Sequence, residues 1–153
     1  MADRYLFRGK DRDTGEWRIG NLSYYGHKRY IDTTPTDGGR HNSRVDPATV
    51  GQCIGITDRA GNAIFEGDII QTYFSFKPGD AGYGISQRPF VVEWQQQRCA
   101  YWGCKPGIDK DKHYFHILDT TSFFEMQSEL YDVIGNIHDS PELLTEGGPS
   151  CTT

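Results

Sequence analysis

Hydrophobic and polar residues alternate along the first thirty positions of the chain. Residues 4–9 and 16–22 both show this two-residue period, and the polar run 11–15, which contains Asp and Gly, separates them. Alternation on both sides of an Asp/Gly turn is typical of a β-hairpin. The tyrosine and isoleucine positions within residues 24–31 predict another strand that extends this ribbon.

The centre of the chain carries the clearest local pattern. Residues 52–56 and 63–73 predict two strands joined by a turn from Asp58 to Gly61. Asp58 can accept backbone N–H bonds in such a turn, and Gly61 can adopt a left-handed conformation without a side-chain clash. Within the second segment, Glu66-Gly67-Asp68 is expected to change the direction of the chain.

The second half of the chain predicts further strands and two short helical segments. Residues 91–94 are expected to form a buried strand, and residues 99–118 one or two more. The serine at position 122, three residues before a glutamate, fits a capping box and predicts a short helix over 122–130. Residues 131–137 predict a strand, and residues 140–144 a capped helical turn with proline at its first position.

Polar segments interrupt these elements. Residues 32–44 and 77–89 are rich in turn-forming residues and predict exposed loops, and a single helical turn is expected between Asp46 and Gly51. No helix-length periodic stretch lies between strands, which disfavours a parallel α/β fold. The predicted class is mainly β, or β-rich α+β: an antiparallel twisted sheet or a small barrel with one or two short helices.

Composition supports one folded domain. The chain has 153 residues, of which 36% are hydrophobic and 13% aromatic, enough for a modest core. We expect residues 1–144 to form this domain and residues 145–153, rich in Gly, Ser, Pro and Thr, to be a flexible C-terminal tail.

Charge and hydropathy disfavour two classes of partner, duplex nucleic acid and membranes. The formal net charge is -5 and no block of consecutive basic residues occurs, so binding to duplex nucleic acid, which needs many phosphate contacts, is disfavoured. No apolar run approaches the roughly 18 residues of a membrane span, and no signal-peptide pattern opens the chain. These observations predict a cytoplasmic protein with no membrane partner, whose four cysteines are free thiols.

Three segments, in order along the chain, are similar to the signatures of a known family. They are RYLFRGK and TGEW at 4–10 and 14–17, GITDRAGN and IFEGDII at 55–62 and 64–70, and VIGNIH and SPELL at 133–138 and 140–144. Together they resemble the YopX family. The long polar loops, and Cys53-Ile54 where the family often carries an aromatic residue, depart from its pattern.

The resemblance implies an origin more than a mechanism. YopX-like proteins occur in phages and prophages, which implies the cytoplasm of a bacterial host, and the family implies no shared enzymatic activity. The signature residues also have a structural interpretation, which we favour. Asp-x-x-Gly fixes a hairpin, Glu-Gly-Asp turns the chain, and Ser-Pro-Glu begins a helical turn.

Metal binding is a first alternative. His113 and His116, with Cys99 and Cys104 upstream, are ligands of the kind that zinc prefers. On a strand, however, residues three apart face opposite sides of the sheet, and the cysteine pair lacks the spacing of a zinc knuckle. The sequence therefore predicts neither a metal nor another cofactor.

Catalysis is a second alternative. Glu66, Asp68, Glu93 and His138 are candidates for an acid–base constellation. Acids in Gly-containing turns more often bond to turn amides, and the sequence has no G-x-S-x-G nucleophile pattern, P-loop or dinucleotide fingerprint. No catalytic residue is therefore assigned, and the protein is expected not to be an enzyme.

Binding is the function that we expect. Tyr and Trp beside Arg favour interfaces and base stacking, and Arg matches phosphate geometry. The candidate ligand-binding residues are Arg8, Trp17, Arg18, Tyr24, Tyr25, Arg29 and Tyr101.

The sequence leaves the bound partner open. The expectation is a non-enzymatic phage or prophage accessory protein that forms a homo-oligomer. One alternative is a sponge that sequesters a nucleotide signal of host antiviral defence in pockets between subunits. Another is a protein-binding inhibitor of a host factor.

Overall fold

The chain folds into two antiparallel sheets. The computed structural model describes residues 3–33, 41–72, 89–95, 100–104, 114–116 and 131–144, with only the backbone at 72, 95, 100–104 and 114–116. The strands are β1 (Phe7–Lys10), β2 (Trp17–Tyr25), β3 (Lys28–Thr33), β4 (His41–Val45), β5 (Gly51–Thr57), β6 (Ala63–Phe65), β7 (Asp68–Thr72), β8 (Phe90–Gln95), β9 (Ala100–Cys104), β10 (Tyr114–His116) and β11 (Tyr131–Asn136). Two 3-10 turns, η1 (Pro47–Thr49) and η4 (Pro141–Leu144), complete the described elements.

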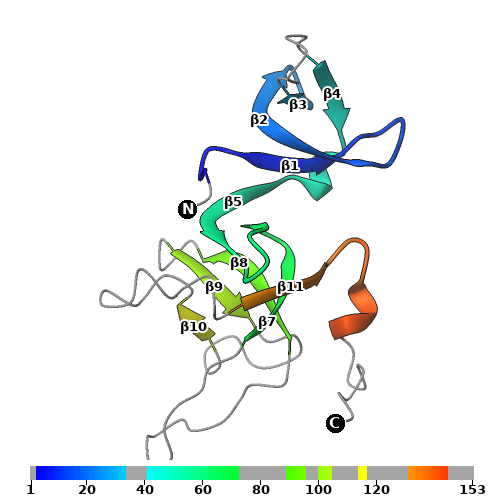
Figure 1. Ribbon diagram of the computed structural model, residues 1–153. Helices are drawn as coiled ribbons and strands as arrows, with labels where there is room; N and C mark the ends of the chain where they lie inside the picture. Colours follow the sequence, from blue (N-terminus) through cyan, green and yellow to red (C-terminus); the bar gives the residue numbers. More distant parts are fainter. Residues whose placement is uncertain are drawn as a thin grey trace, which may run out of the picture.

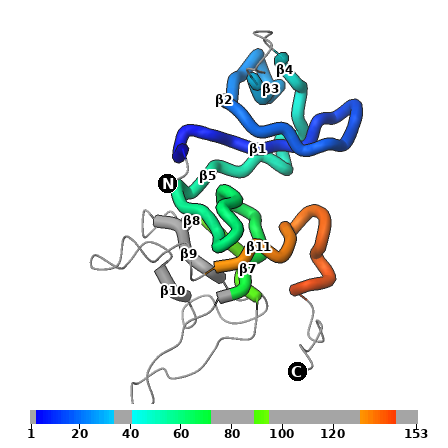
Figure 2. The backbone as a smooth tube through the Cα atoms, viewed as in Figure 1, coloured from blue at the N-terminus to red at the C-terminus, as the bar shows by residue number. Residues whose placement is uncertain are grey.

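The first sheet has six strands in the order β4-β3-β2-β1-β5-β6, and the second has five in the order β10-β9-β8-β7-β11. Figure 1 shows β2, β3 and β4 at one end of the molecule and β7, β8 and β11 at the other, with β5 leading from one to the other. The tube in Figure 2 follows the same path. The predicted β-rich, antiparallel class is confirmed, but the small-barrel alternative is wrong, because neither sheet closes among the described strands.

The predicted hairpins form where expected. β1 pairs with β2 across the turn that begins at Asp11, whose carboxylate accepts N–H bonds from Asp13 at 2.9 Å and Thr14 at 3.2 Å. β5 pairs with β6 across the second turn, where the Asp58 carboxylate accepts the backbone N–H of Asn62 at 2.8 Å. Gly61 has a φ of +86°, the left-handed conformation predicted for it.

The core connects the two sheets. Its buried cluster consists of Ile54, Ile64, Ile70, Phe90, Val92 and Tyr131. These residues come from β5 and β6 of the first sheet and from β7, β8 and β11 of the second. Burial of each large apolar side chain contributes roughly 1.5–3 kcal/mol. The cluster therefore ties the two sheets together.

Three details differ from the sequence predictions. Residues 41–45 form β4, although 32–44 were expected to be a loop. Only Val45 of this strand is buried. The segment therefore does not need the alternating hydrophobic positions by which a half-buried strand is predicted. Tyr24 and Tyr25 end β2 and do not begin the next strand. In β8 the valines are buried as predicted, but Trp94 is 43% exposed.

Both short helical turns are present. Asp46 caps η1 by accepting the N–H of Ala48 at 3.0 Å, with Pro47 at the first position as predicted. η4 is a single 3-10 turn over the predicted segment. Among the described residues, no helix is long and apolar enough to cross a membrane. The expected helix at 122–130, the loop at 77–89 and the tail at 145–153 lie outside the described residues.

Candidate functional site

Arg8 of β1 lies at the junction of the two sheets, and its charge is neutralised there. Its Nη1 is 2.5 Å from Asp68 Oδ1, and its Nη2 donates to the Glu66 carbonyl at 3.3 Å. The guanidinium carbon lies 4.8 Å from the centre of the Trp17 ring and 5.1 Å from that of Phe65. Arg8 thus links β1 to the turn between β6 and β7.

Asp68 is held on both carboxylate oxygens. Oδ1 contacts Arg8, and Oδ2 accepts the N–H of Phe65 at 2.7 Å. Burial raises the pKa of the Asp68 carboxyl, although the Arg8 guanidinium acts in the opposite direction. Arg8 Nε is buried without an acceptor among the described residues, so the pair is not fully satisfied. Breaking the pair would leave a buried charge alone.

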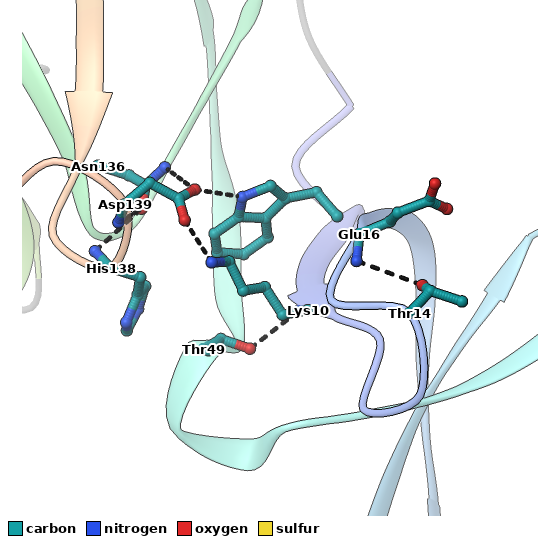
Figure 3. Close-up of polar contacts among 8 residues, drawn as sticks. Lys10, Thr14, Glu16, Thr49, Asn136, His138 and Asp139 are labelled. Atoms are coloured by element: carbon teal, nitrogen blue, oxygen red, sulfur yellow. Dashed lines mark hydrogen bonds and ion pairs between the residues drawn. The ribbon is translucent and has the colours of Figure 1, made fainter.

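Asp139, in the turn after β11, forms a second contact between the two halves (Figure 3). Its carboxylate forms an ion pair with Lys10 and accepts bonds from Trp17 Nε1 at 2.7 Å and Asn136 Nδ2 at 3.0 Å. These donors hold the pKa of the Asp139 carboxyl far below its ordinary value. The ring of His138 lies 5.9 Å from that of Trp17. Burial, together with the cations Arg8 and Lys10, lowers the pKa of His138.

The ribbon β2–β3–β4 has a different character, because its aromatic side chains are exposed. Tyr24 and Tyr25, next to the β2–β3 turn, are 65% and 78% exposed. Arg29 is the cross-strand partner of Tyr24, and its guanidinium carbon lies 5.9 Å from the Tyr24 ring centre. Arg29 Nη1 also donates to the Pro47 carbonyl at 3.0 Å. This pair combines an accessible ring with a positioned cation.

The predicted ligand-binding residues therefore fall into separate groups. Arg8 and Trp17 meet at the junction, whereas Tyr24, Tyr25 and Arg29 meet at the ribbon tip. Arg18 lies elsewhere, paired with Glu16 at 2.9 Å and Asp11 at 3.5 Å. Tyr101 belongs to β9 of the other sheet, and the structure does not describe its side chain.

Two of the acidic residues weighed for catalysis, Glu66 and Asp68, bond to backbone N–H groups. Asp68 is bonded as described above, and the Glu66 carboxylate accepts backbone N–H bonds from Trp94 and Gln52. Burial nevertheless raises the pKa of Glu66, and the neighbouring Glu93 adds to this effect. The His138 ring lies beside the Trp17 indole, tilted by 51° to it. These contacts give the carboxylates structural partners.

Metal-binding geometry is not found among the described side chains, where no group of three or more His, Cys, Asp or Glu residues converges. The residues considered for zinc are not tested by this, because Cys99 and His113 lie outside the described residues and the side chains of Cys104 and His116 are not described. Cys53 is a free, buried cysteine, and burial raises the pKa of its thiol.

Comparison with known proteins defines the family. The family model described as "YopX protein" matches residues 6–145. The chain belongs to the YopX family. No curated protein matches it. Among solved structures it is similar to "Crystal structure of protein EF1440 from Enterococcus faecalis", at 20% identity and a TM-score of 0.44, over 91% of this chain and 96% of that one.

All three segments that resemble YopX signatures meet at the junction. The first supplies Arg8, Lys10 and Trp17, the second supplies Asp68, and the third supplies His138, which Asp139 follows. The contact between Lys10 and Asp139 spans 129 positions of the chain. Residues of all three signature segments therefore take part in joining the two sheets of this YopX-family chain.

Sequence reasoning missed Lys10 and Asp139 as junction residues. The pairing of Tyr24 with Arg29 was also missed, although both residues were selected. For the ribbon a signal was present: in a hairpin with two turn residues, Gly26 and His27, positions 25 and 28 are opposite, as are 24 and 29. For the junction no comparable local signal exists, because Lys10 and Asp139 are 129 positions apart.

Proposed function

We propose that this YopX-family chain is a phage or prophage accessory protein that acts by binding, not by catalysing a reaction, and that its binding surface is the ribbon β2–β3–β4. The observation that carries this proposal is the exposed Tyr24 ring with the half-buried Arg29 beside it, next to an exposed Tyr25. Large aromatic rings at a protein surface, next to arginine, are typical of recognition surfaces.

The ligand class that fits this pair best is a nucleotide. An aromatic base can stack on the exposed Tyr24 ring, and a phosphate can accept bonds from the planar Arg29 guanidinium. The charge of the ribbon supports the choice. Residues 17–33 and 41–45 carry four Lys or Arg residues and one Asp, within a chain of net charge -5, and of the four cations only Arg18 has a carboxylate partner among the described residues. An anion is therefore attracted to this end of the molecule more than to the rest.

The carboxylates support a binding role over catalysis. Among the residues that the structure describes, the buried aspartates are Asp11, Asp58 and Asp68, and each accepts a hydrogen bond from a backbone N–H. A general base must be within reach of a substrate proton, but these groups are committed to turns. The proposal therefore gives them structural roles.

A protein-binding inhibitor is the second candidate. Ile134 of β11 and Ile137 just after it are 42% and 38% exposed, on the sheet opposite to the ribbon. Neighbouring exposed isoleucines favour a protein contact over a nucleotide. A complex formed through this sheet would be insensitive to changes in Tyr24 or Arg29.

Calorimetric titration with a panel of cyclic and linear nucleotides tests the proposal. We expect at least one nucleotide to bind, and we expect Tyr24→Ala and Arg29→Gln each to weaken its binding at least fivefold, which corresponds to about 1 kcal/mol. Tyr5→Ala is the matched control, because Tyr5 is 79% exposed but lies before β1, outside the ribbon.

The outcomes separate the two candidates. Circular dichroism first shows that each variant is folded. If no nucleotide produces heat, the nucleotide proposal is wrong and the inhibitor candidate gains support. If a nucleotide binds the wild type and both ribbon variants equally, binding occurs but the ribbon is not its site.

A further inference from the structure

The pairing register of the ribbon repeats one arrangement three times. Tyr24 is opposite Arg29 and Tyr25 is opposite Lys28 between β2 and β3, and Tyr30 of β3 is opposite Arg44 of β4. In each case a tyrosine faces a cation across the strand. Directly opposite residues lie on the same face of a sheet, so every ring has a positive charge beside it.

Two of these pairs share the open face of the ribbon. Tyr25 with Lys28, and Tyr30 with Arg44, alternate with Ile31 and Val45, which are 0% and 1% exposed and lie on the other face. Tyr25, Lys28 and Arg44 are exposed and Tyr30 is half-buried. Tyr25 and Tyr30 are diagonal neighbours, whose Cα atoms are about 7–8 Å apart in an antiparallel pair.

The cations of the three pairs are not neutralised within the described part of the chain. Arg8, Lys10, Arg18 and Arg59 each have a carboxylate partner there, whereas Lys28, Arg29 and Arg44 have none. The open face does contain one carboxylate, Asp32, which accepts a hydrogen bond from Asn42. The exposed rings are thus accompanied by charges that remain available to an anion.

We propose that this face binds single-stranded nucleic acid. The inference rests on the proposed function and extends it from the Tyr24–Arg29 pair to the two tyrosine–cation pairs of the open face. A single strand offers successive bases that stack on aromatic rings and successive phosphates that meet basic side chains. A mononucleotide engages one pair at a time, but a strand can engage several, which increases its affinity without any new kind of contact.

A duplex fits this surface less well. Its bases are stacked on each other and cannot lie on Tyr25 and Tyr30, so only its phosphates would be bound. The net charge of -5 opposes binding through phosphates alone. The sequence does not reveal this surface, because Lys28 and Arg44 are far apart along the chain and reach the same face only through strand pairing.

Fluorescence anisotropy with a labelled single-stranded DNA of about 12 nucleotides, within the range of site sizes known for single-strand binders, tests the inference. We expect it to bind more tightly than a mononucleotide and than the duplex of the same sequence. Tyr25→Ala should weaken binding about 5-fold to 100-fold, the effect of losing one stacked base, and Tyr25→Phe should retain most of it.

Salt dependence tests the cations. Lys28→Gln and Arg44→Gln should each reduce the slope of log affinity against log salt concentration by about 0.7, the value for one phosphate contact with a single strand. Arg4→Gln removes one positive charge from an exposed position outside the ribbon, and with Tyr5→Ala it is the matched control. Neither control should change the affinity more than twofold.

The outcomes distinguish this inference from the proposed function. A nucleotide that binds as tightly as the oligonucleotide supports the proposed function and overturns the inference. An oligonucleotide that binds equally to the wild type, Tyr25→Ala and Lys28→Gln places the site elsewhere and also overturns it. If neither nucleotides nor oligonucleotides bind, both are wrong.

Discussion

At the scale of single residues, Gly61 shows how far local sequence rules reach. The Asp58–Gly61 turn was predicted from two residue types, and both adopt the expected roles. The Cβ that a side chain would add at Gly61 meets no atom within 4 Å. Its requirement for glycine therefore comes from the backbone conformation alone and not from crowding.

We expect Gly61→Val to lower the free energy of unfolding by about 1–3 kcal/mol, the cost of a β-branched residue at positive φ. Gly61→Asn should cost less, because asparagine tolerates the left-handed region better than other residues. Urea denaturation of the three proteins measures both effects. Equal stability of Val and Asn variants would mean that the turn changes conformation to relieve the strain.

For other residues, the sequence predicted a general role but not the burial or the partner that the fold gives them. Trp94 was expected to be buried with the rest of its strand. Alternation places it on the same face as Phe90 and Val92 of the core, but it lies near the end of β8 and is 43% exposed. Arg8 was selected as a phosphate ligand because of its planar donors, and the structure places Asp68 at 2.5 Å from one of them. Which anion an arginine meets depends on chain segments that are distant in sequence, so residue type alone does not decide it.

At the scale of elements, hairpins were predictable and the contacts between them were not. Turn residues and alternation located β1, β2, β5 and β6, because their pairing is local. β4 was missed, since its pairing with β3 is not signalled by its own polar sequence. The Tyr–cation pairs follow from register, and the register of β3 with β4 could not be inferred from the sequence.

The turn after β11 provides an element-scale prediction. Asp139 joins this turn to β1 and β2 through Lys10 and Trp17. We expect Asp139→Asn to lower the free energy of unfolding at neutral pH by about 1 kcal/mol, a value already reduced for solvent screening of this partly exposed group.

The effect of Asp139 should depend on pH. Because its folded-state pKa lies below its unfolded value, the carboxylate stabilises the fold at pH values above the unfolded pKa of about 3.9 and loses this effect as the pH falls toward the folded pKa. The stability difference between wild type and Asp139→Asn should therefore be full at pH 7 and smaller at pH 3. Glu16→Gln, at an exposed ion pair with Arg18, should change stability by less than about 0.5 kcal/mol. A difference that does not change with pH would assign the effect to hydrogen-bond geometry and not to charge.

At the scale of the whole molecule, exposed apolar side chains suggest self-association, which stays a prediction. Large hydrophobic residues are more than one-third exposed at Tyr5, Ile19, Tyr24, Tyr25, Trp94, Ile134 and Ile137. Contiguous apolar patches of several hundred Å² on a monomer usually mark an interface. The sequence predicts that some of Tyr24, Tyr25, Trp17 and Tyr101 lie at such a contact. Tyr24 and Tyr25 are accessible, the Trp17 indole donates to Asp139, and the side chain of Tyr101 is not described. We therefore expect any homo-oligomer to form through the ribbon tip.

Self-association and strand binding would then use the same surface. Light scattering over a concentration series should show a mass above 17.4 kDa that falls toward the monomer on dilution. Because two partners of one surface exclude each other by mass action, an excess of single-stranded oligonucleotide should also shift the protein toward the monomer. Tyr24→Ser combined with Tyr25→Ser should give the same shift without oligonucleotide, whereas Ile134→Ser combined with Ile137→Ser should leave the oligomer intact. The reverse result for the two double variants would move the oligomer contact to β11, and a monomer at every concentration would refute self-association.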